Sequence, residues 1–406
     1  MAHKQGVRFE LAPTPEQAIV MGRHCGLSRV VENFCLETVR KKWAQRKAEE
    51  TYGITGGELT EVPWSAPALE KHWRAAHPTL FPWFVENKMS SRVPKEACRM
   101  RAAGFANYLK SKNSEHKGTR TGFPTWRKRK FGGRFRYDAD RARPVGVRAV
   151  RLPAIGEVAT REDLCWLTGR LADGRARILG STVREQGGRW WISLQLEVNR
   201  DDINTRRHVA TDAPKCGIDL GLKTFAVIKN DDGSIDEIHA PKPLRAAQRA
   251  LKRANRKLAR AGDNSNNRVK ARKRLARLHL RIAARRRDFL HKATTRLTRT
   301  KSAIAVETLN LKGMIANRRL AHAISDAGFG EFVRQLVYKA GWYGATVWKA
   351  DRWFPSSKTC GDCGHVNRGL VLADRMWECA GCGVVHDRDR NAAGNPLSAM
   401  LADLGG

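Results

Sequence analysis

The segment 215–228 constrains the fold most. It reads KCGIDLGLKTFAVI, an apolar strand that carries one carboxylate, Asp219, between two glycines. The chain then turns at Asp-Asp-Gly, residues 231–233, and returns, which is typical of a β-hairpin. A carboxylate within a buried strand needs a neutralising partner, and a metal ion can be that partner. Because an acid can also serve as a turn residue, the role of Asp219 depends on acids elsewhere in the chain.

The charge balance indicates the class of partner. The 406 residues include 76 Lys and Arg against 40 Asp and Glu, a formal net charge of +36. A chain of this length accommodates roughly two to four structural units. Such an excess of one sign opposes compaction unless a polyanion neutralises it, so the composition predicts nucleic acid as the partner.

Two observations predict an intracellular, cytoplasmic protein that does not bind membranes. No run of about 18 apolar residues is present, and the first residues lack the apolar core of a signal peptide. Disulfides are therefore not expected among the nine cysteines. Five of these are scattered and are interpreted as small core residues: Cys25, Cys35, Cys98, Cys165 and Cys216.

The other four cysteines form two CxxC pairs, Cys360 with Cys363 and Cys379 with Cys382. Each pair places two thiolates on one side of a tight turn, and two such pairs make a tetrahedral sulfur cage for one Zn²⁺. A cage of four sulfurs leaves no open coordination position, so the zinc is expected to be structural.

Three separated segments supply the candidate catalytic acids. Asp219 lies in the first strand, Glu307 ends a second short strand at 302–307, and Asp387 and Asp389 open a C-terminal helix directly after the cysteines. Carboxylates that a sheet and a helix bring together can hold two divalent cations roughly 3.5–4 Å apart, which is the arrangement of phosphodiester hydrolases.

The N-terminal half alternates between helical and extended patterns. A strand at 7–11 precedes a helix that Thr14, Pro15 and Gln17 start with a capping box, and helices resume over 67–112. Strand patterns at 134–137, 149–152, 177–185 and 189–198 predict a small β-barrel. Segment 122–131 mixes cations with aromatics, which suits phosphates and stacked bases; the candidate contacts are Trp126, Arg127, Lys128, Arg129 and Lys130, although a solvated charged loop would look the same.

Residues 243–301 form a dense cationic segment. Apolar residues at helical spacing predict two antiparallel helices that are separated by the break at 262–267. A charge run is usually a solvated face, but here nearly all charges have one sign, which would be costly without phosphates alongside. Arg272, Lys273 and Arg274 are the candidate contacts on this hairpin.

These motifs together resemble the TnpB family. The segments Gly-Ile-Asp-Leu-Gly at 217–221, Val-Glu-Thr-Leu-Asn at 306–310 and Asp-Arg-Asp-Arg-Asn-Ala-Ala at 387–393 look like its three split RuvC motifs. The segment 352–360, which leads into the cysteine cage, and weaker marks at 11–17 and 122–124 are also similar to the family. The family comprises transposon-encoded, RNA-guided DNA endonucleases similar to the miniature type V CRISPR effectors.

The resemblance implies a multidomain α+β fold with an N-terminal wedge barrel, an inserted helical recognition unit and a C-terminal RNase H-like RuvC domain. Its implied boundaries are a first wedge strand at 1–12, the recognition unit at 13–112, the wedge barrel at 113–214, RuvC part I at 215–243, the cationic hairpin at 244–301, RuvC part II at 302–355, the zinc ribbon at 356–385 and RuvC part III at 386–406. Pro396 departs from the family pattern and is expected to kink or shift the last helix without removing the site.

The resemblance also implies the activity: DNA cleavage next to a short flanking motif, directed by a guide RNA on double-stranded target DNA, with two catalytic Mg²⁺ ions (or Mn²⁺ in their place) and one Zn²⁺. The family's third acid stands two residues before Asn-Ala-Ala, which selects Asp389 over Asp387 as the partner of Asp219 and Glu307. Two alternatives stay open, a nuclease-silent RNA-guided repressor and a zinc-ribbon RNA-binding protein. The sequence does not specify the guide, the flanking motif or the oligomeric state.

Overall fold

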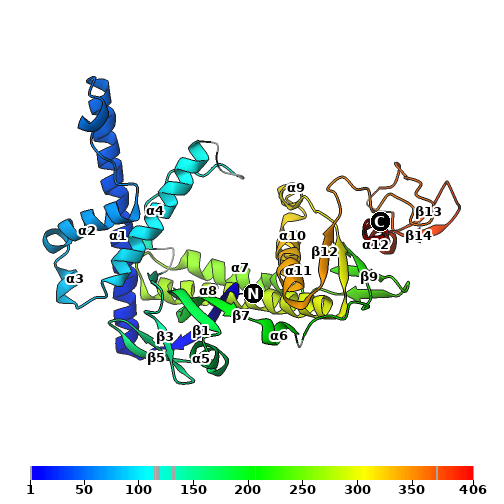
Figure 1. Cartoon of the computed structure of the whole chain (residues 1–406), viewed down its shortest axis with the longest axis horizontal. Coiled ribbons are helices and arrows are strands. Elements are labelled where there is room, and N and C mark those ends of the chain that lie inside the picture. The colour runs from blue at the N-terminus through cyan, green and yellow to red at the C-terminus, as the bar shows by residue number, and fades with distance from the viewer. Residues whose placement is uncertain are drawn as a thin grey trace. The chain divides into compact units, whose positions relative to one another are not determined.

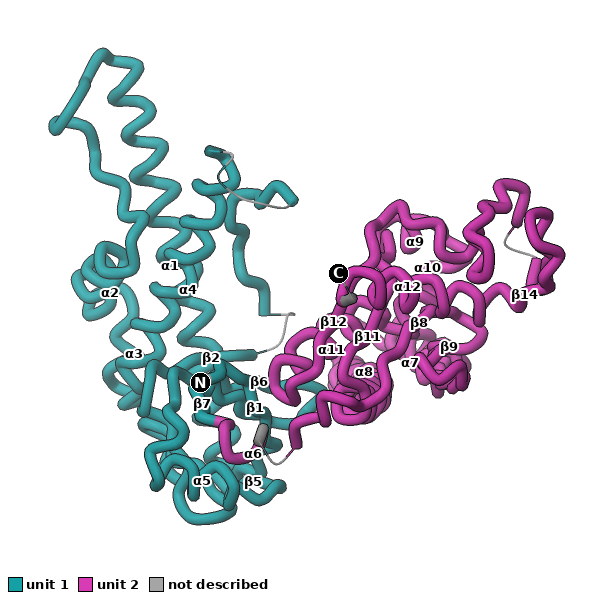
Figure 2. The backbone as a smooth tube through the Cα atoms, turned by 45° about the vertical axis from the view of Figure 1, so that its right-hand side comes forward, with its two compact units in different colours: residues 1–199 teal, residues 200–406 magenta. Residues whose placement is uncertain are grey.

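The computed structural model describes residues 2–113, 115, 119–129, 133–205, 207–371 and 374–405. The chain divides into two compact units, Met1–Asn199 and Arg200–Gly406 (Figures 1 and 2). Each unit has its own sheet and its own hydrophobic core.

The first unit is built on a seven-stranded antiparallel sheet with the order β2-β6-β7-β1-β5-β4-β3. Strand β1 runs alongside β7 over ten residue pairs, and its end, Leu11 and Ala12, pairs with β5. The strands are β1 (Ala2–Ala12), β2 (Arg134–Tyr137), β3 (Arg143–Val145), β4 (Ala149–Leu152), β5 (Gly156–Thr160), β6 (Ala176–Gln186) and β7 (Arg189–Asn199). The four predicted strands after residue 130 are confirmed, two of them to the residue.

The strand pattern predicted a small β-barrel without specifying its closure, and no closed barrel is found in the part of the chain that the structure describes. The edge strands β2 and β3 do not pair with each other, so the sheet is open. Helices α1 (Pro15–Thr51) and α4 (Arg92–Lys112) both pack against β2.

The helices of the first unit follow the sequence signals closely. The side chain of Thr14 accepts from Gln17 N–H and the side chain of Gln17 accepts from Thr14 N–H, so the predicted capping box starts α1. Helix α4 packs against both α1 and α2 (Ala66–Leu80). The remaining helices are α3 (Trp83–Glu86), α5 (Cys165–Ala172) and the 3₁₀ turn η1 (Gly56–Glu58). Cys25, Cys35 and Cys98 are buried as predicted, but Cys165 is exposed at the first position of α5, so the core assignment was wrong for this residue.

The second unit contains a five-stranded sheet with the order β10-β9-β8-β11-β12. Strands β8 (Cys216–Leu220), β9 (Ala226–Asn230) and β10 (Ile235–Ile238) form an antiparallel meander. Strands β11 (Ala303–Val306) and β12 (Thr346–Lys349) then add in parallel on the other side of β8. The predicted hairpin after Asp219 and the predicted strand before Glu307 are both present.

Helices cover both faces of this sheet. On one face, Ile218, Ile304 and Val306 pack in one cluster with side chains of α8 (Asn266–Thr300) and α11 (Phe329–Tyr343). On the other face, Ala303 and Ala305 pack against Leu397 and Met400 of α12 (Arg388–Gly405). Successive strand residues point to opposite faces, so β8 and β11 are each divided between these two layers.

The other elements of the second unit extend from this core. Helix α7 (Pro243–Arg260) packs against α8 as the predicted cationic hairpin, with the break at 261–265. The short helices are α6 (Asp201–Thr205), α9 (Leu311–Ala316) and α10 (Ala321–Ala327), and strands β13 (Met376–Glu378) and β14 (Val385–Asp387) form a ribbon beside α12. Helix α12 is continuous through Pro396. Cys216 is buried in β8. Within the described ranges, no helix combines the length and apolar composition needed to cross a membrane.

Candidate active site and metal cage

Asp219 and Glu307 stand side by side because of the register between two parallel strands. Ala305 pairs with Gly217 and Val306 with Ile218, so the next position in this register places Glu307 opposite Asp219. Neighbouring strands are about 4.8 Å apart. Two acids from distant parts of the sequence are thus brought to the same end of adjacent strands.

Both acids face the layer that contains α12. Side chains alternate between the two faces along a strand, so Glu307 follows Ala303 and Ala305 on the face that packs against α12. For the same reason, Asp219 lies on the same face of β8 as Gly217. Gly217 is required there for close approach. A Cβ at this position would lie 2.0 Å from the carbonyl oxygen of Ala393 and 2.9 Å from Leu397 Cβ. The glycine therefore lets α12 lie directly on β8.

Helix α12 brings in the third acid. Asp389 is in its first turn, and Asp387 is the last residue of β14. Asp387 Oδ1 accepts a hydrogen bond of 2.9 Å from the N–H of Arg390, so this carboxylate caps the helix. Asp389 is close enough to Asp219 to raise its pKa. The geometry thus separates the two acids into a cap and a member of the cluster.

The electrostatics of the cluster are those of a site suited to a cation. Burial, followed by the negative charges of Glu307 and Asp389, raises the pKa of Asp219 to about 8, while the nearby Arg388 opposes the shift. Burial also raises the pKa of Glu307, against the effects of a hydrogen bond from the Ser356 hydroxyl and of Arg388. A divalent cation would favour the ionised form of every acid here.

The three carboxylates have not closed into a ligand shell. Among the described residues, the groups of three or more potential ligands within 4.8 Å of one another involve only the cysteine region. Asp389 instead pairs with an arginine: its two oxygens are 3.0 and 3.2 Å from Nη1 of Arg375. This arginine, immediately before β13, holds the carboxylate that would complete the set.

The four cysteines of the two CxxC pairs do converge. Cys360, Cys363, Cys379 and Cys382 place their sulfurs within 4.8 Å of one another, with Cys360 and Cys379 buried and the other two exposed. Four thiols at such distances fit a tetrahedral Zn²⁺. His386, which sequence reasoning did not select, lies at the edge of this cage: its Nε2 is 3.0 Å from Cys360 Sγ and 3.5 Å from a carboxylate oxygen of Asp362.

The predicted nucleic-acid contacts at 126–130 divide into surface and interior residues. Trp126 is 42% exposed, and Lys128 and Arg129 are also exposed. Arg127 differs from its neighbours, because its largely buried guanidinium forms an ion pair with Glu32 and donates to Ser28 Oγ. A buried carboxylate requires such a partner, so Arg127 is committed to the packing of α1. Lys130 lies outside the described residues.

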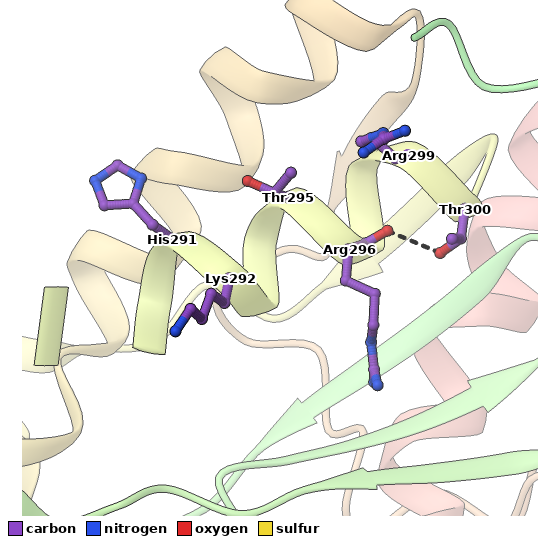
Figure 3. Close-up of a pocket in the computed structure, with 6 residues that line it drawn as sticks. All are labelled: His291, Lys292, Thr295, Arg296, Arg299 and Thr300. Carbon is purple, nitrogen blue, oxygen red and sulfur yellow. Dashed lines mark hydrogen bonds between the residues drawn. The ribbon is translucent and has the colours of Figure 1, made fainter. Parts of the chain in front are cut away.

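Helix α8 presents a continuous cationic surface. Arg272, Lys273 and Arg274 are exposed near its start. Further along, a hollow of about 570 Å³ is lined by residues of this helix, and Figure 3 shows how their side chains lie along its last turns: His291, Lys292, Thr295, Arg296, Arg299 and Thr300. Behind it, the buried Lys339 donates to the hydroxyls of Thr294 and Thr295.

Sequence reasoning missed residues that act on the acids directly. The Ser356 hydroxyl donates a hydrogen bond to Glu307, and the charge of Arg388 lowers the pKa of Glu307. Arg375 forms an ion pair with Asp389. Asn391 and Asn395 of α12 bind the segment that leads into the cage. Only the asparagines left a signal, since two amides four residues apart share one face of a helix.

Three family models match this chain. The model described as "Probable transposase" covers residues 193–318, "Cas12f1-like, TNB domain" covers 329–395, and "Helix-turn-helix domain" covers 1–48. A curated protein of Streptomyces pristinaespiralis named "Putative RNA-guided DNA endonuclease" is 34% identical over 98% of this chain and 90% of its own length. The chain belongs to the TnpB family.

This TnpB-family chain has other relatives and structural neighbours. An Escherichia coli K12 protein named "Putative RNA-guided DNA endonuclease InsQ" is 29% identical over the whole chain and 94% of its own length. The protein in the "Cryo-EM structure of the Cas12f1-sgRNA-target DNA complex" is similar over 97% of this chain and 98% of its own, with a TM-score of 0.49 and 13% identity. In the region of the helix-turn-helix model, this chain has strand β1 and the single long helix α1.

Proposed function

We propose that this protein is an RNA-guided DNA endonuclease that cleaves target DNA next to a short flanking motif in an RNase H-like RuvC site. The observation that carries the proposal is the strand register that sets Glu307 opposite Asp219, beneath the helix that bears Asp389. The names of the curated relatives support it. The strand order β10-β9-β8-β11-β12 supports it as well, because it places the strands that carry Asp219 and lead to Glu307 next to each other.

In this proposal Asp219, Glu307 and Asp389 hold two Mg²⁺ ions, which Mn²⁺ can replace. Bound divalent cations would supply activation of water and stabilisation of the leaving oxygen of the phosphodiester. The chain's own part is to gather three carboxylates at one buried place, where burial and then the charges of Glu307 and Asp389 raise the pKa of Asp219 to about 8. The Ser356 hydroxyl orients Glu307, and Arg388 offsets part of the negative charge.

The remaining parts receive supporting roles. The wedge and recognition regions (residues 1–214) and the cationic hairpin (244–301) would hold the guide RNA and the target DNA, while residues 215–243, 302–355 and 386–406 would form the interrupted RuvC domain. The net charge of +36 supports polyanion binding. The four cysteines would hold one structural Zn²⁺ in the ribbon at 356–385.

The test is Mg²⁺-dependent cleavage of a matched DNA target by protein loaded with its co-purified RNA. Asp219→Ala and Glu307→Ala should abolish cleavage and leave DNA binding nearly intact, because dispersed cations provide the affinity. Asp236→Ala, which removes an exposed acid on β10 of the same sheet, is the matched control and should cleave normally. Wild-type cleavage by Asp219→Ala would refute the assignment.

The same assay separates the two alternatives. A nuclease-silent repressor would bind the RNA-matched DNA without cutting it at any Mg²⁺ concentration. A zinc-ribbon RNA-binding protein would retain RNA but show no guide-directed DNA binding.

A further inference from the structure

The segment 356–361 touches both candidate metal sites. At one end, the Ser356 hydroxyl donates a hydrogen bond to Glu307 Oε1. At the other end, Cys360 belongs to the cysteine cage, and Gly361 follows it in the first tight turn. The segment therefore joins the hydrogen-bond partner of a candidate catalytic acid to a candidate zinc ligand.

Two asparagines of α12 bind this segment through its backbone. Asn391 accepts from the Gly361 N–H at 2.9 Å and donates to the carbonyl oxygen of Thr359 at 2.7 Å. Asn395 donates to the same carbonyl at 2.7 Å and to that of Ser356 at 2.6 Å. The two amides thus make four hydrogen bonds to three backbone positions.

These contacts are buried and closely fitted. Asn391 and Asn395 are each 6% exposed. A Cβ at Gly361 would lie 3.0 Å from Asn391 Oδ1 and 3.4 Å from Asn395 Oδ1, so a glycine at this point lets the cage approach the helix. Removing either amide would leave buried carbonyl or amide groups without a partner, which is costly. The helix and the segment leading into the cage are therefore expected to move as one body.

We propose that Asn391 and Asn395 are positioning residues that couple the cysteine cage to the acid cluster. Zinc in the cage orders the 356–361 segment. The segment fixes α12, and with it Asp389, through the two amides, and it fixes Glu307 through Ser356. His386 provides a second link between the cage and the helix. Its Nε2 lies 3.0 Å from Cys360 Sγ, and the next residue, Asp387, caps α12.

The inference rests on the proposed function, since it takes Asp219, Glu307 and Asp389 as a divalent-cation site. It adds a thermodynamic requirement. If zinc in the cage raises the affinity of the acids for a divalent cation by some factor, cation binding must raise the affinity of the cage for zinc by the same factor. A zinc site that merely stabilises the ribbon makes no such demand.

The experiment measures Mn²⁺ binding to RNA-free full-length protein by electron paramagnetic resonance, with Asp219→Ala as the blank for sites elsewhere. Cys382→Ser, which changes an exposed ligand of the cage, should weaken Mn²⁺ binding by about tenfold, within the usual range of coupling. The Asn391→Ala/Asn395→Ala double variant should keep its zinc yet show a similar loss.

A double-mutant cycle then isolates the coupling. Adding Cys382→Ser to the asparagine double variant should cause little further loss of Mn²⁺ affinity, because the link is already broken. Ser398→Ala, an exposed position on the same helix, should bind zinc and Mn²⁺ like the wild type. If the double alanine variant does not fold, Asn391→Asp serves instead: it keeps the acceptor for Gly361 and loses the donor to Thr359, so a smaller loss is expected.

Two failures are distinguishable. Asparagine variants that hold zinc and bind Mn²⁺ with wild-type affinity would overturn the coupling, even if Asp219→Ala removes the Mn²⁺ site. Unchanged Mn²⁺ binding in Asp219→Ala would instead show that the acids are not the cation site, which refutes the proposed function itself.

Discussion

Asp389 and Arg375 form an ion pair in which one guanidinium nitrogen lies 3.0 and 3.2 Å from the two carboxylate oxygens. The arginine comes from the cysteine ribbon and the acid from the first turn of α12. In this arrangement a positive side chain pairs with the carboxylate that we propose as a ligand of a divalent cation. The pair is partly exposed, so the competition is modest in energy.

Removing this competitor should ease cation binding. We expect Arg375→Ala to reach half-maximal cleavage at a Mg²⁺ concentration lower by roughly two- to fivefold, the range that an exposed ion pair supports. Arg368→Ala removes the same charge from an exposed ribbon position and should leave the Mg²⁺ dependence unchanged. A higher Mg²⁺ requirement in Arg375→Ala would mean that the arginine positions Asp389 for the metal.

The acids at 387 and 389 should respond differently to the same substitution. Asp389→Ala should eliminate cleavage, because it removes a member of the cluster. Asp387→Ala removes a helix cap and should lower the free energy of unfolding by about 0.5–2 kcal/mol with at most a modest loss of rate. Denaturant unfolding measures the loss of stability, and cleavage by RNA-loaded protein measures the loss of activity. A greater loss of cleavage in Asp387→Ala than in Asp389→Ala would show that Asp387 is the catalytic acid.

The raised pKa of Asp219 predicts a pH-dependent stability. Its pKa rises from 3.8 to about 8 on folding, so between these values the folded protein retains a proton that the unfolded chain releases. In Mg²⁺-free buffer the wild type should therefore lose stability relative to Asp219→Asn as pH rises from about 4 to 8. Added Mg²⁺ should restore stability more at pH 8 than at pH 6. A pH-independent difference between the two proteins would contradict the shift.

The exposed cations of α8 should contribute to RNA affinity through counterion release. Replacing Arg272, Lys273 and Arg274 by alanine should lower the salt dependence of log K by roughly two to three units, one for each phosphate that the variant no longer neutralises. The control, Arg334→Ala, removes an exposed cation outside the proposed nucleic-acid regions that already pairs with Glu331, and its slope should stay close to that of the wild type. A triple variant with the same slope as this control would place the RNA elsewhere.

Local pattern was enough to predict much of this protein. The capping box at Thr14, the alternation of the strands after residue 130 and the break in the cationic hairpin depend on neighbouring residues, so the sequence carried them. The same holds for the CxxC pairs, because two residues between thiols fix a turn whatever surrounds it. The acids were selected by their place at strand ends and by family motifs.

The rest depended on partners that are remote in sequence. Arg127 has the same charge as its neighbours Lys128 and Arg129, and only the position of Glu32, 95 residues away, puts it in the interior. The sheet is open, and α1 and α4 pack against its edge strand β2, contacts that no strand pattern encodes. Cys165 is exposed because its helix turns that position outward.

The sequence by itself determined which residues are candidates for binding metal and nucleic acid, since side-chain chemistry and short spacings suffice to select candidates. Only the tertiary structure decided which groups surround the acids. Gly217 lets α12 lie directly on β8, and Arg375 forms an ion pair with Asp389. Two asparagines of α12 bind the segment that leads into the cysteine cage. The physical reason is that hydrogen bonds and ion pairs act over about 3 Å, and only the folded chain brings these groups within that distance.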